Sequence, residues 1–413
     1  MDYSKLFHEE KDFARDTYAA RMEEFGFKNM GRMELFLWDL EVFLQIQKIL
    51  GDRVLLKGGA ATQFYLPREA QRTSVDIDML FCGTEQECRE TLDKIEELLN
   101  EGDGLFIFRK HIPRNPKTTL PLCTYHVDIP SVLTNVERNV EEEKIPHQEL
   151  KIEFILQPEK WEFERRTGEN IFAVNSKWEY QLLPLNHLFA DKLTTIGCET
   201  IGVQNDRMDE QIKQFYDILM LTRYCLPQLQ CILVREKYLK RAEEEWRVRK
   251  NTECDLEVII ADARKQLFRY EMVDGGEDAE LKKYIHDFHS LYLNGKVDYS
   301  PQSVACGAAL VRLMYELMLS GEGWGKIHQA LQIAECLELR ELSGKEKGLM
   351  VRQIREKLIN EFESYSPIPA KILKGKNIVR IFWAVADIDN LDEIEAVLDR
   401  CMQDFRKEIM GKY

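Results

Sequence analysis

Two aspartates one residue apart lie within an apolar stretch of the sequence. Asp76 and Asp78 occur in SVDIDMLF, residues 74–81, where apolar and polar residues alternate. This alternation predicts a β-strand, and positions two apart on a strand face the same side. Two neighbouring carboxylates repel each other, and a divalent cation with hard oxygen ligands removes that cost. The pair therefore predicts a Mg²⁺ or Mn²⁺ site of the phosphoryl-transfer kind, with Asp76 and Asp78 as ligands.

Two consecutive glycines precede the acid pair. Gly58 and Gly59 follow the apolar run Val54 to Leu56 and Lys57, and they lead into AATQFYL, which can start a helix. Glycine lets backbone N–H groups approach a phosphate without interference from a Cβ atom. Each signal is weak by itself, because Gly-Gly is usually a turn and Asp-x-Asp is common on edge strands. Together they predict a phosphate cradle beside the acid pair.

A third carboxylate is expected near the attacking hydroxyl in two-metal phosphoryl transfer. Two later predicted strands offer one: Asp128 in YHVDI and Glu153 in LKIEFIL. For either residue taken alone, the preferred interpretation is an exposed polar position of an alternating strand.

The rest of the chain divides by its periodicity. The first fifty residues and the stretch 85–101 have helical patterns, whereas 105–156 consists mostly of short β-like segments. After Trp178 the pattern is almost entirely helical. We therefore predict an α+β fold with a mixed sheet flanked by helices, followed by a helical C-terminal region. The predicted parts are a catalytic domain with N-terminal helices (1–175), helices that complete the active site (176–228) and a helical domain of unknown role (229–413).

Composition limits the functional classes. The 413 residues carry a net charge of −15, which is unlike a domain that coats duplex DNA. Ten scattered cysteines without a C-x-x-C pair, and a charged start, indicate a reduced, cytoplasmic protein. The apolar run from Val304 to Leu319 contains Arg312 and Glu316, so no membrane segment is expected.

The two motifs, LLKGGAATQFYL and RTSVDIDMLF, resemble the signature of the AbiEii/AbiGii-type nucleotidyltransferase toxins, in the DNA polymerase β-like nucleotidyltransferase superfamily. The family pattern is an apolar run, Lys-Gly-Gly-Thr, an amphipathic helix and Arg-x-Ser-x-Asp-[Ile/Leu]-Asp. Here Lys57–Ala60 and Arg72–Asp78 match it. Ala60 stands where the family usually has a small hydroxyl residue, which puts one phosphate-contacting hydroxyl in doubt.

A second family element is also similar. It pairs a helical lysine with an acid about two dozen residues later, and here these are Lys192 and Asp217. The residues before that acid depart from the family's Arg and Asp: they are Lys213 and Gln214, with Arg207 and Asp209 as partial substitutes. The resemblance covers roughly residues 35–222, and its LKIEF strand favours Glu153 over Asp128 as the third carboxylate.

The resemblance implies a nucleotidyltransferase fold and a role for each matching residue. Asp76 and Asp78 would hold the metal, with Glu153 beside them. The triphosphate would be lined by Lys57, Gly58, Gly59, Arg72 and Ser74. Lys192 would neutralise phosphate charge, and Asp217 would orient Lys192 or help to activate the acceptor hydroxyl.

The implied activity is transfer of an NMP from an NTP to an acceptor hydroxyl, with a tRNA 3′ end as acceptor, by a toxin that has a cognate antitoxin. One alternative acceptor is a protein side chain or an aminoglycoside-like small molecule, which the acidic balance would suit. Another alternative is a non-catalytic nucleotide-binding module: the degenerate second element supports it, and the intact acid pair opposes it.

A basic stripe could hold RNA phosphates. It consists of Lys237, Lys240, Arg241, Arg247, Arg249 and Lys250. The preferred interpretation of this stripe is a solvated helix face.

Overall fold

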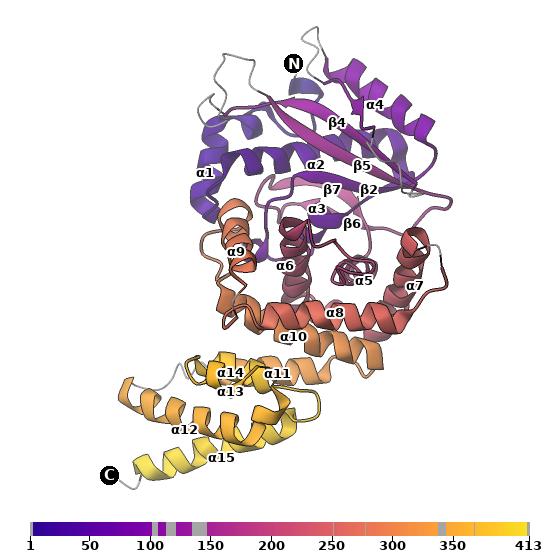
Figure 1. The fold of residues 1–413 in the computed structure, drawn as a ribbon. Coiled ribbons are helices and arrows are strands. Elements are labelled where there is room, and N and C mark those ends of the chain that lie inside the picture. The colour runs from indigo at the N-terminus through magenta and orange to yellow at the C-terminus, as the bar shows by residue number, and fades with distance from the viewer. Residues whose placement is uncertain are drawn as a thin grey trace.

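The computed structural model describes residues 3–100, 106–112, 121–133, 147–250, 252–276, 278–337, 344–366 and 368–410. A seven-stranded mixed sheet occupies one end of the molecule and a stack of helices the other (Figure 1). The strand order is β3-β4-β5-β2-β1-β7-β6. The strands are β1 (Val54–Lys57), β2 (Asp76–Cys82), β3 (Arg109–Lys110), β4 (Leu122–Pro130), β5 (His147–Gln157), β6 (Glu164–Gly168) and β7 (Ser176–Leu182).

The helices follow the predicted periodicity. They are α1 (Arg15–Phe25), α2 (Met30–Leu50), α3 (Gly58–Gln63), α4 (Glu85–Leu99), α5 (Leu185–Leu193), α6 (Met208–Tyr224), α7 (Cys231–Lys250), α8 (Leu256–Glu271), α9 (Ala279–Tyr292), α10 (Pro301–Ser320), α11 (Gly325–Cys336), α12 (Gly344–Phe362), α13 (Ala370–Leu373), α14 (Ile378–Val385) and α15 (Leu391–Met410). The predicted α+β class with a helical C-terminal region is confirmed.

The centre of the sheet is built from β1, β2 and β5. Strand β2 runs antiparallel to β1 and parallel to β5. Ile77 and Met79 of β2 are fully buried, while Asp76 and Asp78 on the alternate positions are partly exposed, as the period-two pattern predicts. Helix α2 packs across β1, β2, β5 and β7, and α3 lies against the acid-bearing face together with α5 and α6.

One prediction about the sheet was wrong. The chain does not turn helical at residue 178, because β7 extends to Leu182 and pairs in parallel with β1 through Leu56 and Leu182. Three of the first four residues of β7 are exposed, whereas its last three residues are buried. That mixture hides the alternation by which a strand is identified in a sequence.

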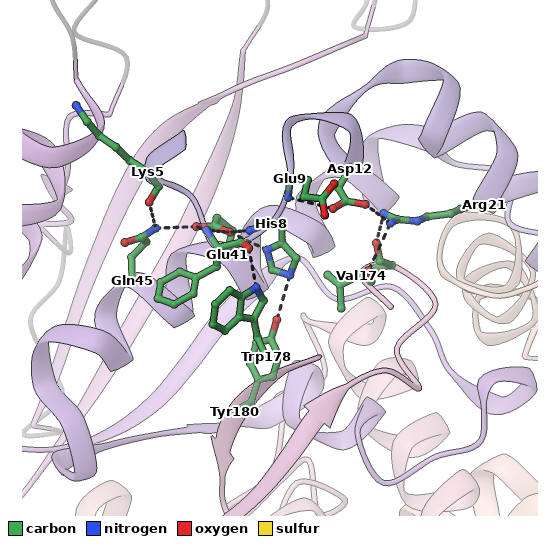
Figure 2. Close-up of polar contacts among 12 residues, drawn as sticks. Lys5, His8, Glu9, Asp12, Arg21, Glu41, Gln45, Val174, Trp178 and Tyr180 are labelled. Carbon is green, nitrogen blue, oxygen red and sulfur yellow. Dashed lines mark hydrogen bonds and ion pairs between the residues drawn. The ribbon is translucent and has the colours of Figure 1, made fainter. Parts of the chain in front are cut away.

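The N-terminal segment is fastened to α2 and β7 by buried polar contacts (Figure 2). The Glu41 carboxylate accepts the backbone N–H groups of Phe7 and His8 at 3.0 and 3.1 Å and contacts His8 Nδ1 at 2.7 Å. Trp178 Nε1 donates to the carbonyl of Phe7 at 2.6 Å. The contacts with Glu41 satisfy buried polar groups that would otherwise cost stability.

Helix α10 forms the centre of the helical part. Among the described residues it is the one helix long and apolar enough to cross a membrane, and 67% of its most apolar window is buried within the protein. It packs against α6, α7, α8 and α14. Burial of this kind is what a core helix shows.

Candidate active site

The acid pair lies in the middle of a row of aligned side chains. In the sheet register Lys57 of β1 faces Asp78 of β2, and Asp78 faces Glu153 of β5. Thr124 of β4 continues the row, and its hydroxyl donates to Glu153 Oε1 at 3.3 Å. Residues opposite one another in a sheet project from the same face, so these groups share one surface.

A second row lies beside the first. Asp76 faces Lys151 of β5, and the Lys151 ammonium binds Glu153 Oε1 at 2.7 Å. Lys151 thus stands next to all three carboxylates, Asp76, Asp78 and Glu153. It was missed in the sequence, although its place two residues before Glu153 puts both side chains on one face of the strand.

The acids of this surface do not ionise independently. Burial, with Glu153 and Asp76 as charged neighbours, raises the pKa of Asp78 to about 7. Burial likewise raises the pKa of Asp76. Burial also acts on Glu153, but the Lys151 ammonium outweighs it and lowers the pKa of that carboxyl. The repulsion expected between neighbouring carboxylates is therefore present.

This donor set fits a hard divalent cation. Asp76 and Asp78 offer carboxylate oxygens on one face, and a cation between them would offset the burial and the neighbouring carboxylates that raise their pKa values. In the described part of the chain, no group of three or more His, Cys, Asp or Glu side chains is arranged as a complete metal cage. Mg²⁺ keeps several waters and substrate phosphates as ligands, so a two-carboxylate site is the usual protein contribution.

The glycines are required by contact with the acid-bearing strand. Gly58 has φ +68°, and a Cβ atom there would overlap with the carboxylate of Asp78. A Cβ on Gly59 would lie 2.6 Å from Arg72 Nη2 and 3.2 Å from Ser74 Oγ. The two glycines thus allow the first turn of α3 to lie directly on Asp78, Arg72 and Ser74.

Replacing Gly58 with alanine should therefore abolish most of the transfer activity and destabilise the fold by about 1–3 kcal/mol. The matched control is Gly51→Ala, since Gly51 has φ +62° but no atom within 4 Å of its Cβ position. Measurement of unfolding in urea and of activity for both variants separates backbone strain from the contact with Asp78. Equal effects in the two variants would contradict the contact.

Behind the glycines lies a buried ion cluster. Arg72 donates to both oxygens of Asp217, from Nε at 2.8 Å and from Nη2 at 2.7 Å. Lys192 Nζ lies 2.8 Å from Asp217 Oδ2 and also donates to Gln214 Oε1 at 2.6 Å. All three charged side chains are at most 4% exposed. Burial acts on Asp217, but Arg72 and Lys192 prevail and lower its pKa.

The cluster carries two cations and one anion, so one positive charge remains. The Arg72 guanidinium of this cluster packs directly against Gly59, where the remaining positive charge can act on a phosphate. Asp217 is fully buried and saturated by its partners, which favours the orienting role over proton transfer with a substrate. Asp217 of the second motif thus pairs with Arg72 of the first, whereas Arg207 and Asp209 are exposed and take no part in the cluster.

The predicted alternatives for the third carboxylate are separated by the sheet. Glu153 lies beside Asp78, whereas Asp128 faces Glu149, four residues away along β5, and binds Arg109 at 2.8 Å. Four residues of strand correspond to roughly 13 Å. Asp128 is therefore a surface ion-pair partner in this structure.

Two further residues lie beside the site: Lys213, noted in the sequence only as a departure from the family pattern, and Asp191, which gave no signal there. Lys213 of α6 binds Glu210 and lies 4.9 Å from the centre of the Tyr292 ring, and it is one of the cations that act on Asp76. Asp191 of α5 holds Lys57 Nζ at 2.9 Å and Arg241 Nε at 3.1 Å. Burial opposes the ionisation of Asp191, but these two cations lower its pKa to about 2. Asp191 thus fixes the Lys57 head group near Asp78.

The basic stripe of α7 is largely neutralised within the helix. Arg247 binds Glu243, Arg249 binds Glu245, and Arg241 binds both Asp191 and Glu245. Pairs of this kind at the surface contribute little and leave little free charge. The preference for a solvated face is supported for Arg247 and Arg249.

Comparison with known families bears directly on this surface. Residues 42–292 match the family model described as nucleotidyl transferase AbiEii toxin, type IV TA (toxin–antitoxin) system. The chain belongs to this family. The predicted resemblance is confirmed, and the protein is a nucleotidyltransferase of the AbiEii toxin family. The match includes both motifs and extends beyond residue 222 to Tyr292, at the end of α9.

Solved structures show only distant likeness. JHP933 from Helicobacter pylori has 16% identity and a TM-score of 0.35, over 73% of this chain and 96% of that one. MenT4, the nucleotidyltransferase toxin Rv2826c from Mycobacterium tuberculosis H37Rv, has 13% identity and a TM-score of 0.37, over 74% and 98%. No curated protein sequence matches the chain. Function therefore follows from the family and from the site.

Proposed function

We propose that this AbiEii-family enzyme uses Asp76 and Asp78 as its metal ligands and transfers an NMP from an NTP to the 3′ end of a tRNA. The observation that carries the proposal is the row Lys57, Asp78 and Glu153 on one face of the sheet, directly against Gly58. Membership of the AbiEii family implies that the site would bind Mg²⁺ or Mn²⁺ and an NTP, and that the protein would have a cognate antitoxin as its partner.

The reaction joins the acceptor oxygen to the α-phosphorus as the bond between the α-phosphorus and the bridging oxygen breaks and pyrophosphate leaves. The acceptor proton passes to a carboxylate of the row or to water. Gly58 and Gly59, with no Cβ atoms, would present their backbone N–H groups to the triphosphate, with Ser74 beside Gly59. The Arg72, Lys192 and Asp217 cluster supplies a fixed positive charge that needs no reorganisation during the step.

Asp76 and Asp78 would hold the metal, with Glu153 held ready by Lys151 and Thr124. When bound, the cation neutralises charge on the phosphate and favours the ionised form of the acceptor hydroxyl. Lys57, fixed by Asp191, completes the charge balance on the other side of Asp78.

A protein side chain or an aminoglycoside-like small molecule is the alternative acceptor, supported by the net charge of −15. A non-catalytic nucleotide-binding module is the other alternative. The buried Arg72–Asp217 pair weakens it, because that pair joins the first motif to the acid of the second despite the changes at Lys213 and Gln214.

The three-part division of the chain is also a proposal. Its first boundary moves from 175 to beyond Leu182, because β7 belongs to the sheet. Helices α5 and α6 then complete the active site, and the helices from α7 onward form the C-terminal part. A cytoplasmic location is proposed on the ten scattered cysteines, which include no C-x-x-C pair.

Transfer of label from each of four α-³²P-NTPs tests the proposal. Purified protein is incubated with Mg²⁺ and a mixture of total tRNA and cell protein. We expect label on RNA that is lost with EDTA, restored by Mg²⁺ or Mn²⁺, and absent with Asp76→Asn/Asp78→Asn. Label on protein would replace tRNA by the alternative acceptor. Absence of label with every NTP would refute the enzymatic proposal.

A further inference from the structure

A cavity of about 500 Å³ opens beside the row of acids. It lies between α5, α7 and the segment that joins β5 to β6, and its lining includes Lys57, Leu80 and Trp161. Its volume falls within the usual range for pockets that hold small ligands, roughly 300–1,000 Å³.

The cavity adjoins the catalytic surface. Leu80 is two residues beyond Asp78 on β2, so the two side chains share a face and their Cα atoms are roughly 7 Å apart. Lys57, which faces Asp78 in the register, lines the cavity as well. A ligand there would lie within one nucleotide's reach of the acids.

One wall of the cavity is aromatic. The Trp161 ring meets the His187 ring edge to face, with centroids 5.7 Å apart and an angle of 71°. Burial, together with the nearby Lys237 ammonium, lowers the pKa of His187, so its imidazole is neutral at pH 7. Among the described residues, nothing hydrogen-bonds its buried Nδ1. The wall therefore offers a flat stacking surface next to an unused polar group.

The charges around the cavity nearly cancel. Lys57 and Arg241 are both engaged by Asp191, and Lys160 is engaged by Asp52 at 2.8 Å. The remaining lysines of the lining, Lys237 and Lys240, stand among Glu159, Glu162 and Glu244. These carboxylates would repel a triphosphate, whereas they would not repel an uncharged base and sugar.

We propose that this cavity binds the nucleobase and ribose of a nucleotide whose reacting phosphate or hydroxyl lies at Asp76 and Asp78, with Trp161 as the stacking surface. The inference rests on the proposed function. The nucleoside can come from two sources, the incoming NTP or the terminal nucleotide of a nucleic-acid acceptor, and stacking on an aromatic ring serves both.

Equilibrium binding without turnover tests this. The probes are the α,β-methylene analogues of the four NTPs and a single-stranded RNA 12-mer, each titrated in Mg²⁺ by calorimetry. Trp161→Leu should weaken the binding of one probe class by about tenfold or more, and Trp161→Phe by no more than about threefold. The matched control is Trp246→Leu, which removes another half-buried tryptophan, on α7 but outside the cavity.

Weaker binding of the NTP analogues would assign the cavity to the incoming nucleotide, and weaker binding of the RNA would assign it to the acceptor. If the wild type binds neither probe, or if Trp161→Leu binds both as the wild type does, the inference is wrong. Thermal unfolding of each variant excludes misfolding. If binding depends on Trp161 but the protein transfers no label, the cavity still binds a nucleoside and the proposed transfer function is rejected.

Discussion

An Asp78→Asn variant should lose transfer activity by about 10²- to 10⁴-fold and yet be more stable than the wild type at pH 7. Loss of a ligand that stabilises charge in the transition state costs several kcal/mol of barrier. The gain in stability has a separate cause, which is that Asp78 is held among Glu153, Asp76 and buried surface. Asparagine keeps the shape and removes the charge.

The pH dependence follows from the raised pKa of Asp78, about 7 against an ordinary value of 3.8. Below pH 3.8 the carboxyl is protonated in both the folded and the unfolded chain, and it costs nothing. Between these values folding takes up a proton, so the wild type loses stability as the pH rises. Above pH 7 the penalty is complete. Asp78→Asn should thus gain about 1–3 kcal/mol at pH 7 and nothing near pH 3.5.

Urea unfolding at pH 3.5, 5.5, 7 and 8 measures this difference. Asp128→Asn is the control, because Asp128 also lies on the sheet but forms a surface pair with Arg109. Its unfolding free energy should stay within about 1 kcal/mol of the wild type. If Asp78→Asn is less stable than the wild type, or if its gain in unfolding free energy does not change with pH, ionisation of Asp78 does not destabilise the folded protein.

Asp217→Asn should destabilise the protein by about 3–5 kcal/mol, the largest stability effect that we expect. The substitution leaves Arg72 and Lys192 buried with no anion, since both bind Asp217 and all three side chains are at most 4% exposed. Because the pKa of Asp217 is lowered in the folded state, its contribution is present above pH 3.8 and is lost as the pH falls further.

A triple variant separates charge from packing. Arg72→Met/Lys192→Met/Asp217→Leu replaces the cluster by apolar side chains of similar size, which often leaves stability unchanged or raises it. It should therefore unfold at a urea concentration close to that of the wild type, but without activity, because the positive charge under Gly59 is gone. If Asp217→Asn costs less than about 1 kcal/mol, the three groups are not a buried ion cluster in solution.

The sequence by itself determined the local chemistry. Period-two alternation put Asp76 and Asp78 on one face of a strand, and the glycines marked a place where no Cβ fits, for which Asp78 and Arg72 are the reasons. The motif resemblance predicted the family that residues 42–292 match. The alternation is legible in the sequence because it depends on neighbours within a few residues.

Tertiary structure alone decided the rest. The resemblance favoured Glu153 over Asp128, but the position of Glu153 beside Asp78 depends on the parallel pairing of β2 with β5, which joins strands about 75 residues apart and leaves no local pattern. The Arg72–Asp217 pair spans 145 residues, and each residue alone has the sequence context of an ordinary surface charge. β7 was missed because its exposed start hides its alternation. The Trp161 cavity exists only because α5 and α7 pack beside the sheet, since the burial of a side chain is a property of the whole fold.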